Sequence, residues 1–256
     1  MHKFDEAKRL IRNSNAITVL TGAGISAESG IPTFRGKNGF WVSGSKNYTP
    51  QDFARFSYFR SHPIEVLKWY RERQIQISHA QPNQAHYALA ELERQMSENK
   101  KSFLIITQNI DNLHRKAGSK KIAEIHGNIF EFRCSSTYSS DKHHLRIFNL
   151  DLSTVENVET LRCEKCNAFL RPNVLWFDET YDPRFFDIEL AETHFQKTDL
   201  LIVVGTTLQT TFPYLLVESA IGRNLPIIEI NPEPVMGKLP VFSFADSAAT
   251  VLPKLI

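Results

Sequence analysis

The sequence predicts an α/β fold, in which a doubly wound, Rossmann-like parallel sheet carries a smaller inserted lobe. Three observations support this prediction. Short apolar runs recur along the chain, amphipathic helix-like segments lie between several of them, and two stretches interrupt the alternation. The runs expected to form buried parallel strands are residues 16–20, 103–107, 200–204 and 226–230.

Each apolar run ends in a cluster of small or hydrogen-bonding residues. The carboxyl ends of parallel strands meet at one edge of a sheet, and ligands of open α/β sheets bind just outside that edge. The clusters are therefore expected to form a single nucleotide-binding site. They are residues 22–26, 108–111, 205–207 and 231–233.

The first cluster belongs to a glycine-rich segment, residues 21–36. Glycine lets the backbone approach a bulky anion, and the amides that open a helix favour phosphate oxygens, so a nucleotide diphosphate is the expected ligand. The spacing departs from the simple dinucleotide pattern, because Ala27 stands where a third glycine would fall. An ordinary tight turn is the alternative, and the unusual tail from Ser29 to Arg35 argues against it.

Two stretches interrupt the strand–helix alternation and are expected to form the second lobe. The first is aromatic-rich and predicted to be helical, with Ser61 as a cap and Pro63 in the first turn. The second contains a Cys-x-x-Cys pair and shows no strong periodicity. A cleft between lobe and core would hold the substrate. The core is expected to comprise residues 1–36, 81–130 and 171–256, and the lobe residues 37–80 and 131–170.

Bulk composition restricts the partners and the compartment. The chain has 256 residues, with 30 basic and 28 acidic side chains. This balance argues neither for nor against a nucleic-acid partner, so no direct one is implied. No apolar run approaches a membrane span, and the amino terminus lacks the apolar stretch of a signal peptide. Three cysteines make no disulfide framework and fit a reducing compartment. A cytoplasmic protein without a membrane partner is expected.

Two further motifs give the chain a family resemblance. Residues 108–114 contain a Gln-Asn-x-Asp block, and residues 124–127 end in a His-Gly pair. Together with the glycine-rich segment, and in this order, they resemble the sirtuins, the NAD-dependent protein-lysine deacylases. Residues 171–179 and 205–207 extend the resemblance, which covers nearly the whole chain.

The resemblance implies NAD as the cofactor and assigns a role to each part of the sheet edge. Ala23 and its flanking glycines would hold the pyrophosphate, and Phe34 with Arg35 would close over the nicotinamide ribose. The 108–111 block would line the ribose and nicotinamide pocket, and the last two clusters would meet the adenosine half. The implied cofactor residues are Gly22, Ala23, Gly24, Ser26, Phe34, Arg35, Trp41, Gln108, Asn109, Ile110, Asp111, Gly205, Thr206, Thr207, Asn231, Pro232, Glu233 and Ala248.

The same resemblance makes His126 the general base and gives Asn109 and Asp111 catalytic roles. Breaking the nicotinamide–ribose bond creates an oxocarbenium-like centre that the acyl oxygen attacks. An imidazole with an ordinary pKa near about 6.5 can then take a proton from a ribose hydroxyl. Taken singly, a His-Gly pair is a turn and an Asn-x-Asp block caps a helix; their joint occurrence favours the functional interpretation. The histidines expected to be structural or solvated are His86, His114, His143 and His144.

Tyr70 and Arg73 lie three residues apart on the helix expected after Pro63, so their side chains share one face. An arginine fork pairs with a carboxylate, and a tyrosine hydroxyl adds a donor. Such a Tyr-x-x-Arg pair lies at the floor of the acyl pocket in sirtuins that remove succinyl, malonyl or glutaryl groups. The chain is therefore expected to remove acidic acyl groups, producing nicotinamide and O-acyl-ADP-ribose. An ordinary amphipathic helix, and a plain deacetylase, are the alternatives.

Sirtuins usually carry a structural zinc on two Cys-x-x-Cys pairs. Here Cys163 and Cys166 supply one pair, but Cys134 is followed by Thr137 at the place of the fourth thiolate. A hydroxyl is a poor zinc ligand, so a lobe without metal, or with weakly held metal, is preferred. The alternative is that three thiolates recruit a substitute. The candidates for it are Asp141, His143 and His144.

The segment Trp176, Phe177, Asp178 and Glu179 resembles the strand that pairs with the acylated substrate peptide, where the family usually has glycine in place of Asp178. The implied partners are acylated lysine side chains on proteins. NAD hydrolysis or ADP-ribosyl transfer would use the same cleft without an acyl pocket, and an NAD-sensing module would not need His126. The acyl-pocket pair and the substrate strand favour deacylation.

Overall fold

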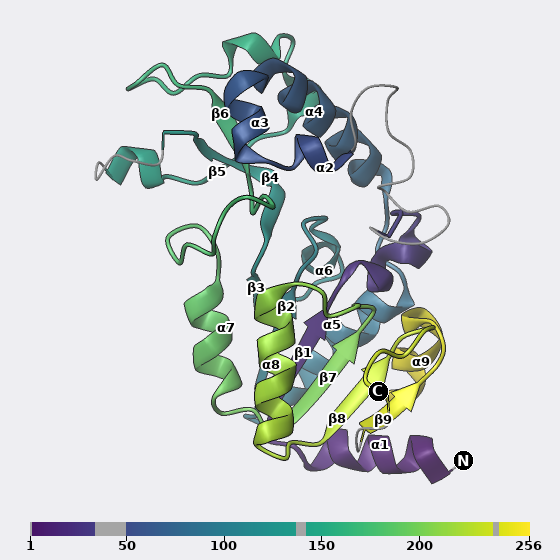
Figure 1. The fold of residues 1–256 in the computed structure, drawn as a ribbon. Coiled ribbons are helices and arrows are strands. Elements are labelled where there is room, and N and C mark those ends of the chain that lie inside the picture. Colours follow the sequence, from purple (N-terminus) through teal and green to yellow (C-terminus); the bar gives the residue numbers. More distant parts are fainter. Residues whose placement is uncertain (1, 34–49, 137–141, 238–240) are drawn as a thin grey trace.

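The computed structural model describes residues 2–33, 50–136, 142–237 and 241–256. At its centre lies a six-stranded sheet with the order β3-β2-β1-β7-β8-β9, in which all neighbouring strands are parallel (Figure 1). The chain builds outward from β1 on one side and from β7 on the other, so the topological switch point lies between these two strands. The strands are β1 (Ala16–Thr21), β2 (Ser102–Thr107), β3 (Ile122–Glu124), β7 (Leu200–Val204), β8 (Ile227–Ile230) and β9 (Val241–Phe244).

The predicted strands are confirmed, and the sheet is larger than the sequence indicated. The four apolar runs form β1, β2, β7 and β8. The two strands that were not predicted, β3 and β9, are the edges of the sheet. They are too short for an apolar run to be recognised, and a single parallel neighbour holds each of them.

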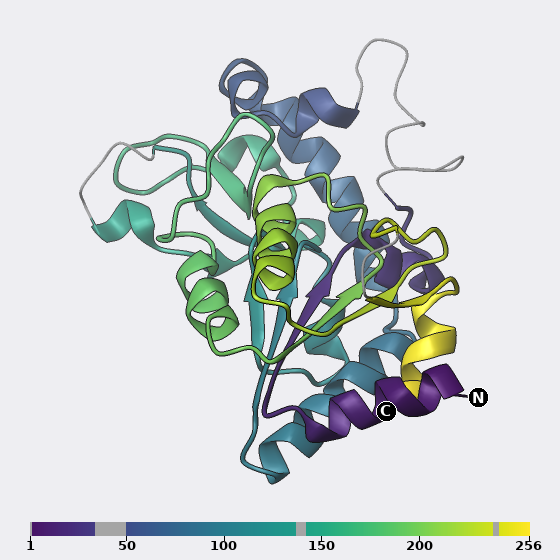
Figure 2. The same cartoon turned by 60° about the horizontal axis from the view of Figure 1, so that its bottom comes forward.

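Helices cover both faces of the sheet, as a doubly wound fold requires (Figures 1 and 2). Strand side chains alternate between the faces: Val19 packs with α1, α5 and α9, whereas Leu20 packs with α7 and α8. The strands therefore read as continuous apolar runs, because both of their faces are buried. The helices are α1 (His2–Asn13), α5 (Gln84–Glu98), α9 (Ala248–Leu255), α7 (Ile188–Phe195) and α8 (Thr211–Gly222).

A second, antiparallel sheet and a group of helices lie beyond the carboxyl ends of β1 and β2 (Figure 1). A third apolar cluster joins α4 to this sheet, with Leu67 and Phe132 fully buried between them. The elements are β4 (Gly127–Cys134), β5 (Phe148–Asn149), β6 (Leu170–Val174), α2 (Pro50–Phe53), α3 (Phe56–Ser61), α4 (Pro63–His79), and the 3-10 helices η2 (Lys142–Leu145), η3 (Leu152–Thr154) and η4 (Val158–Thr160). The small α6 (Leu113–Lys116) follows β2.

One local prediction in this region is wrong. Ser61 is the last residue of α3 and does not cap the next helix; His62 is the N-cap of α4 and makes no side-chain cap bond. Pro63 does open α4, since its missing N–H is not needed in the first turn. The expected division into core and lobe stays a prediction, with its boundaries at 130/131 and 170/171 falling inside β4 and β6. Within the described part of the chain, none of the helices is long and apolar enough to cross a membrane.

Candidate active site

Direct backbone contact closes the switch point between β1 and β7. The amide of Gly24 donates to the carbonyl of Gly205 over 2.8 Å. A Cβ atom on Gly24 would lie 2.7 Å from the Cα of Gly205, and one on Gly22 would lie 2.8 Å from its carbonyl oxygen. Gly205 has a φ of 58°, in the left-handed region. These glycines therefore let two strand-end loops pack together, a requirement that the sequence interpretation, based on ligand approach, did not include.

The glycine-rich segment continues as a 3-10 helix, η1 (Ala23–Ser29), where an ordinary helix opening was expected. It ends at Gly30, whose φ of 80° suits a left-handed cap. Asn83, the N-cap of α5, holds this helix in place, because its Nδ2 donates to the carbonyl of Ile25 (2.8 Å) and to Ser29 Oγ (3.0 Å).

A buried acid, amide and hydroxyl meet behind η1. Ser26 Oγ donates to Asp111 over 2.7 Å, and Asn109 Nδ2 donates to Ser26 Oγ and to the carbonyl of Gly22, both at 3.1 Å. Burial raises the pKa of Asp111 above its ordinary value. Its carboxylate also accepts from the amide of Leu113, which opens α6, so the capping interpretation of this block is correct as well. The structure thus brings three predicted cofactor residues into contact.

Gln108 connects the end of β2 to the end of β7. Its Nε2 donates to Thr206 Oγ1 over 2.9 Å, and its Oε1 accepts from Thr210 Oγ1 over 3.1 Å. Asn231, at the end of β8, donates from Nδ2 to the carbonyl of Thr206 over 3.0 Å. The predicted clusters at the strand ends therefore form one hydrogen-bonded edge, as the sequence indicated.

The predicted adenosine side is more open. Thr207, Pro232 and Glu233 are exposed beyond the ends of β7 and β8, whereas the side chain of Ala248 is buried in the core at the start of α9.

Glu28 ties the glycine-rich segment to the same helix α9. Its carboxylate accepts from Ser247 Oγ over 2.8 Å and from the amide of Ala249 over 3.0 Å. The amide of Ala249 belongs to the first turn of α9, where the helix provides no acceptor for it. No local sequence pattern predicts this link, because 219 positions separate Glu28 from Ser247.

His126 is held in one tautomer. Its Nδ1 lies 3.0 Å from the carbonyl oxygen of Gln108, which can only accept, so Nδ1 carries the proton. The other nitrogen, Nε2, lies 3.0 Å from the hydroxyl of Tyr181 and accepts from it. Burial lowers the pKa of His126 to about 4 and outweighs the bond to Gln108, which raises it. The imidazole is therefore neutral near pH 7, with its Nε2 lone pair directed toward Tyr181.

Gly127 explains why a His-Gly pair follows β3. It has a φ of 79°, and a Cβ atom there would lie 1.8 Å from the carbonyl oxygen of Asn173 in β6. The glycine makes the turn into β4, so the interpretation of this pair as a turn holds for its second residue. The neighbouring His126 has its side chain in the site.

Two other histidines are structural, as expected. His86 is buried and its Nδ1 accepts from the amide of Asn83 in the capping box of α5. His114 Nε2 lies 3.1 Å from Thr21 Oγ1. Burial lowers the pKa of His86 to about 4 and lowers that of His114 as well, so both are neutral near pH 7.

A buried ion pair shapes the predicted substrate strand. Arg171 is fully buried and pairs with both carboxylate oxygens of Glu179, at 2.5 and 2.8 Å. The same guanidinium lies 3.4 Å from the ring centroid of Trp176. Phe177, which lies between Trp176 and Glu179 in the sequence, has an exposed side chain. Its amide donates to the carbonyl of Ala54 over 2.9 Å.

Asp178 has a structural role that the sequence did not reveal. Its two carboxylate oxygens accept from the amides of Phe56 (2.6 Å) and Ser57 (2.9 Å), which open α3. Burial, which raises the pKa of Asp178, is outweighed by these hydrogen bonds, so its pKa is lowered. A residue noted for its departure from glycine thus links the predicted substrate strand to α3.

The predicted acyl-pocket residues lie on α4 beside this strand. Tyr70 is buried, burial raises its pKa, and its hydroxyl accepts from Trp176 Nε1 over 2.7 Å. Arg73 is partly buried, with its guanidinium 5.0 Å from the ring centroid of Trp69 and its Nη1 donating to Gln76 over 2.7 Å. The predicted floor of the pocket and the predicted peptide strand therefore meet through one hydrogen bond.

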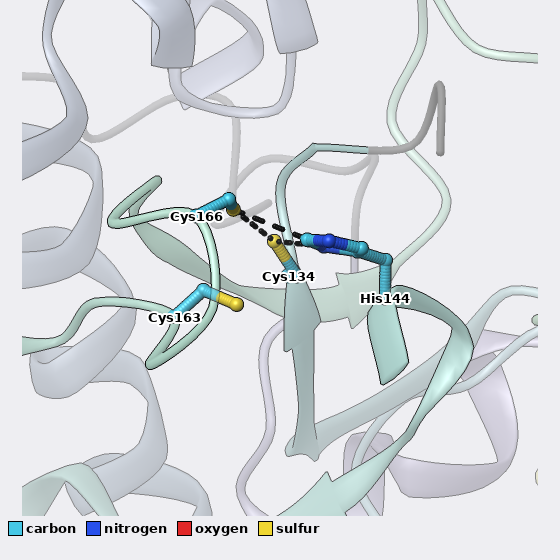
Figure 3. A group of neighbouring side chains, drawn as sticks. All are labelled: Cys134, His144, Cys163 and Cys166. Carbon is cyan, nitrogen blue, oxygen red and sulfur yellow. Dashed lines mark hydrogen bonds between the residues drawn. The ribbon is translucent and has the colours of Figure 1, made fainter. Parts of the chain in front are cut away.

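Figure 3 shows the group formed by the three cysteines and His144. Their ligand atoms all lie within 4.8 Å of one another, and His144 Nδ1 is 3.2 Å from Cys134 Sγ. Three sulfurs and one imidazole nitrogen are a donor set that suits tetrahedral zinc, so this group can hold a metal ion. His144 therefore occupies the place that Thr137 was expected to leave without a ligand, and the reason for preferring a metal-free lobe no longer holds.

Several predicted residues lie outside the described part of the chain. They are Phe34, Arg35, Trp41, Thr137 and Asp141, together with the side chain of His143.

Tyr181 is a site residue, among those that the structure describes, that the sequence interpretation missed. It lies 55 positions from His126, so local spacing could not connect the two. The only available signal was an aromatic residue just after the predicted substrate strand.

The doubly wound sheet has a buried carboxylate and a neutral imidazole at its switch-point edge. This arrangement defines an enzyme of the nucleotide-binding α/β class.

Comparison with known proteins identifies the family. A family model described as the Sir2 family matches residues 22–211. The NAD-dependent protein deacylase of Leptospira interrogans serogroup Icterohaemorrhagiae serovar Lai (strain 56601) is 42% identical over 243 residues, covering 94% of this chain and 91% of that protein. A crystal structure of a Sir2 homologue–NAD complex is 35% identical, with a TM-score of 0.82 and coverage of 98% of this chain and 91% of that one. A structure described as Sir2–p53 peptide–NAD+ is 28% identical, with a TM-score of 0.79 and coverage of 98% and 96%.

The chain therefore belongs to the Sir2 family. As a member of it, the protein is an NAD-dependent deacylase.

Proposed function

We propose that this enzyme removes acidic acyl groups, such as succinyl and malonyl, from lysine side chains of proteins. It would transfer them to NAD and release nicotinamide and O-acyl-ADP-ribose. The observation that carries the deacylation chemistry is the fixed tautomer of His126, which leaves Nε2 as an acceptor at the carboxyl edge of the sheet, whereas the acyl preference rests separately on α4. The similarity to a Sir2 structure with a peptide and NAD supports a protein substrate.

The sheet edge fits a dinucleotide. At Gly22, Gly24 and Gly205 the backbone of two loops lies at the switch point without intervening side chains. We assign the pyrophosphate to the first loop, including Ala23 and Ser26. We assign the ribose and nicotinamide to residues 108–111, which include Ile110. We assign the adenosine to the residues that follow β7 and β8. Phe34, Arg35 and Trp41 complete this assignment from the sequence.

The chain's own residues then have simple tasks. When bound, NAD supplies a ribose carbon that becomes electrophilic as nicotinamide leaves. His126 Nε2 takes a proton from a ribose hydroxyl, while the carbonyl of Gln108 keeps the ring in the required tautomer. Asp111 orients the nicotinamide amide from a position that Ser26 and Leu113 hold. Asn109 lies against the same hydroxyl of Ser26.

The preference for acidic acyl groups rests on α4. The hydroxyl oxygen of Tyr70 accepts from Trp176, which leaves its own proton to donate to an acyl carboxylate. Arg73 stands one turn further on the same helix, partly removed from water, where a guanidinium binds a carboxylate more strongly than on the surface. A plain deacetylase would need neither donor.

The test is a steady-state comparison of one peptide carrying acetyl-, malonyl-, succinyl- or glutaryl-lysine. We expect Arg73→Met to lower kcat/KM for succinyl-lysine roughly 100-fold, because charge-assisted hydrogen bonds are lost, and to spare acetyl-lysine. Arg71→Met, two positions away on α4, is the matched control. Equal loss on both acyl groups would refute the acidic-acyl preference.

His126→Ala tests the chemistry itself. Loss of a general base is expected to lower kcat by about 100- to 10,000-fold. Nicotinamide release that does not depend on added acyl-peptide would instead favour NAD hydrolysis or ADP-ribosyl transfer as the activity.

We also propose that Cys134, His144, Cys163 and Cys166 hold a structural zinc away from the chemistry. Metal analysis of protein purified without chelator should find one zinc per chain, and His144→Ala should lose it and lower the Tm. Lys142→Ala, also in η2, should keep it. A zinc content of zero in the parent protein would contradict this assignment. Reduced cysteines of this kind also fit a cytoplasmic location.

A further inference from the structure

Tyr181 lies against the general-base nitrogen from the segment between β6 and α7. Its hydroxyl is 3.0 Å from His126 Nε2, and the two rings stack with centroids 5.9 Å apart and planes at 24°. Phe212 of α8 packs on the phenol ring at 5.6 Å. Because Nδ1 carries the proton of the neutral imidazole, the phenol is the donor in this contact.

The proposed chemistry needs the same nitrogen. In the plane of a neutral imidazole, Nε2 has a single lone pair and accepts one good hydrogen bond. A ribose hydroxyl that is to lose its proton to Nε2 has to donate to that lone pair. The phenol of Tyr181 and the ribose hydroxyl therefore cannot both be bonded there.

We propose that Tyr181 is a positioning residue that competes with the ribose hydroxyl of the cosubstrate for His126 Nε2 and is displaced when the nucleotide binds. This inference rests on the proposed role of His126. In the unliganded enzyme the phenol gives Nε2 of the partly buried His126 a hydrogen-bond partner, and so keeps the ring in place. In the loaded enzyme it has to leave the base.

The chemistry of the phenol suits a displaceable donor. Burial raises the pKa of Tyr181 to about 12, so the hydroxyl stays protonated near neutral pH and cannot take over the role of the base. A neutral hydrogen bond is worth little in net free energy, which lets another hydroxyl replace it.

The surrounding segment allows the displacement. Residues 180–184 form neither a helix nor a strand, and Tyr181 is only partly buried. The segment is anchored on one side by Glu179, through its ion pair with Arg171, and on the other by the buried Phe185. The phenol ring can therefore turn away from His126 while both anchors stay in place.

The direct test is the affinity for ADP-ribose of the whole protein, measured by calorimetry. Tyr181→Phe removes only the competing hydroxyl, so ADP-ribose should bind roughly three- to tenfold more tightly than to the parent protein. The KM for NAD should fall in parallel, by a larger factor than any change in kcat. Tyr214→Phe, an exposed tyrosine on α8, should change neither value. A residue that merely supported the fold would weaken binding or leave it unaltered, and either result would overturn the inference.

A double-mutant cycle separates this inference from the proposed function. In a His126→Ala background, Tyr181→Phe should no longer improve ADP-ribose affinity, because no Nε2 is left to compete for. If the gain persists there, the hydroxyl acts elsewhere and the inference fails. If His126→Ala keeps full turnover, the proposed base fails, whereas the competition still stands on the binding data.

A spectroscopic measurement covers the case of a poorly folding variant. In the parent protein, the ¹⁵N resonance of His126 Nε2 and the hydroxyl proton of Tyr181 should both shift when ADP-ribose is added. A hydroxyl proton that stays bonded to Nε2 in the complex would overturn the proposal.

Discussion

The two sheets of this enzyme are held together in different ways. At the carboxyl edge of the large sheet, loops meet through bare backbone at Gly24 and Gly205, and neutral side chains such as Gln108 and Thr206 form hydrogen bonds between the strand ends. Around the small sheet, large and charged side chains carry the contacts, above all Arg171 with Glu179. The first region depends on glycines, which have no side chain, and the second depends on particular charged side chains. Substitutions should therefore damage the two regions by opposite means, by added volume in one and by lost partners in the other.

The largest effect is expected in the small sheet. Arg171→Met removes the closer of the two arginines that pair with Glu179 and leaves it only Arg133, at 3.6 Å, which should cost up to about 3–5 kcal/mol in the free energy of unfolding. Urea unfolding followed by circular dichroism measures it. Arg94→Met is the matched control, because the ion pairs of Arg94 with Glu91 and Glu98 are exposed. The free energy of unfolding of this variant should hardly change. Equal losses in both variants would mean that burial of the pair does not matter.

A smaller effect is expected at the large sheet. Gly24→Ala would place a Cβ atom 2.7 Å from the Cα of Gly205, and backbone on both sides has to shift, at a cost of about 1–3 kcal/mol. ADP-ribose affinity should fall with it, since the same loop is assigned to the pyrophosphate. Gly222→Ala, at the end of α8 with no atom near the added Cβ, should leave both unchanged or stabilise slightly. Normal nucleotide affinity in Gly24→Ala would remove the argument from close approach.

The smallest effect is expected at Asp178, which joins the predicted substrate strand to α3 beside the small sheet. Asp178→Asn keeps one acceptor but loses the charge at the start of α3, and should cost about 0.5–1 kcal/mol. Because the pKa of Asp178 is lowered in the folded protein, its contribution is fully present above its ordinary pKa and is lost as the pH falls through the folded value. The stability difference between parent and variant should therefore be present at pH 7 and shrink below about pH 4. A difference that persists at pH 3 would exclude a charge effect.

The fold was largely readable from the sequence, because strands buried on both faces leave continuous apolar runs and polar ends. The edge strands β3 and β9 escaped, since three or four residues carry too little pattern. The hydrogen-bonded edge at the strand ends was also readable, because its residues follow strands directly. A sequence pattern shows which residues follow a strand, and the parallel sheet then brings those strand ends together.

The features that the sequence analysis did not predict depend on contacts between residues far apart in the sequence. Sequence spacing offered three candidates for the fourth zinc ligand, and among the described residues the fold places His144 beside the three cysteines. The contact between Tyr181 and His126, and the cap that Asp178 places on α3, likewise join segments that no local pattern connects. The departure from the family pattern at Asp178 indicated that this residue is unusual. It did not indicate that the side chain accepts hydrogen bonds from the first amides of α3.

The bond from Glu28 to the start of α9 has a consequence for biosynthesis. Ser247 and Ala249, which donate to the Glu28 carboxylate, are made 219 and 221 positions after it. A nascent chain that ends before α9 has every glycine of residues 21–36 and still lacks both donors. The glycine-rich segment can therefore gain this contact only after the ribosome has reached α9.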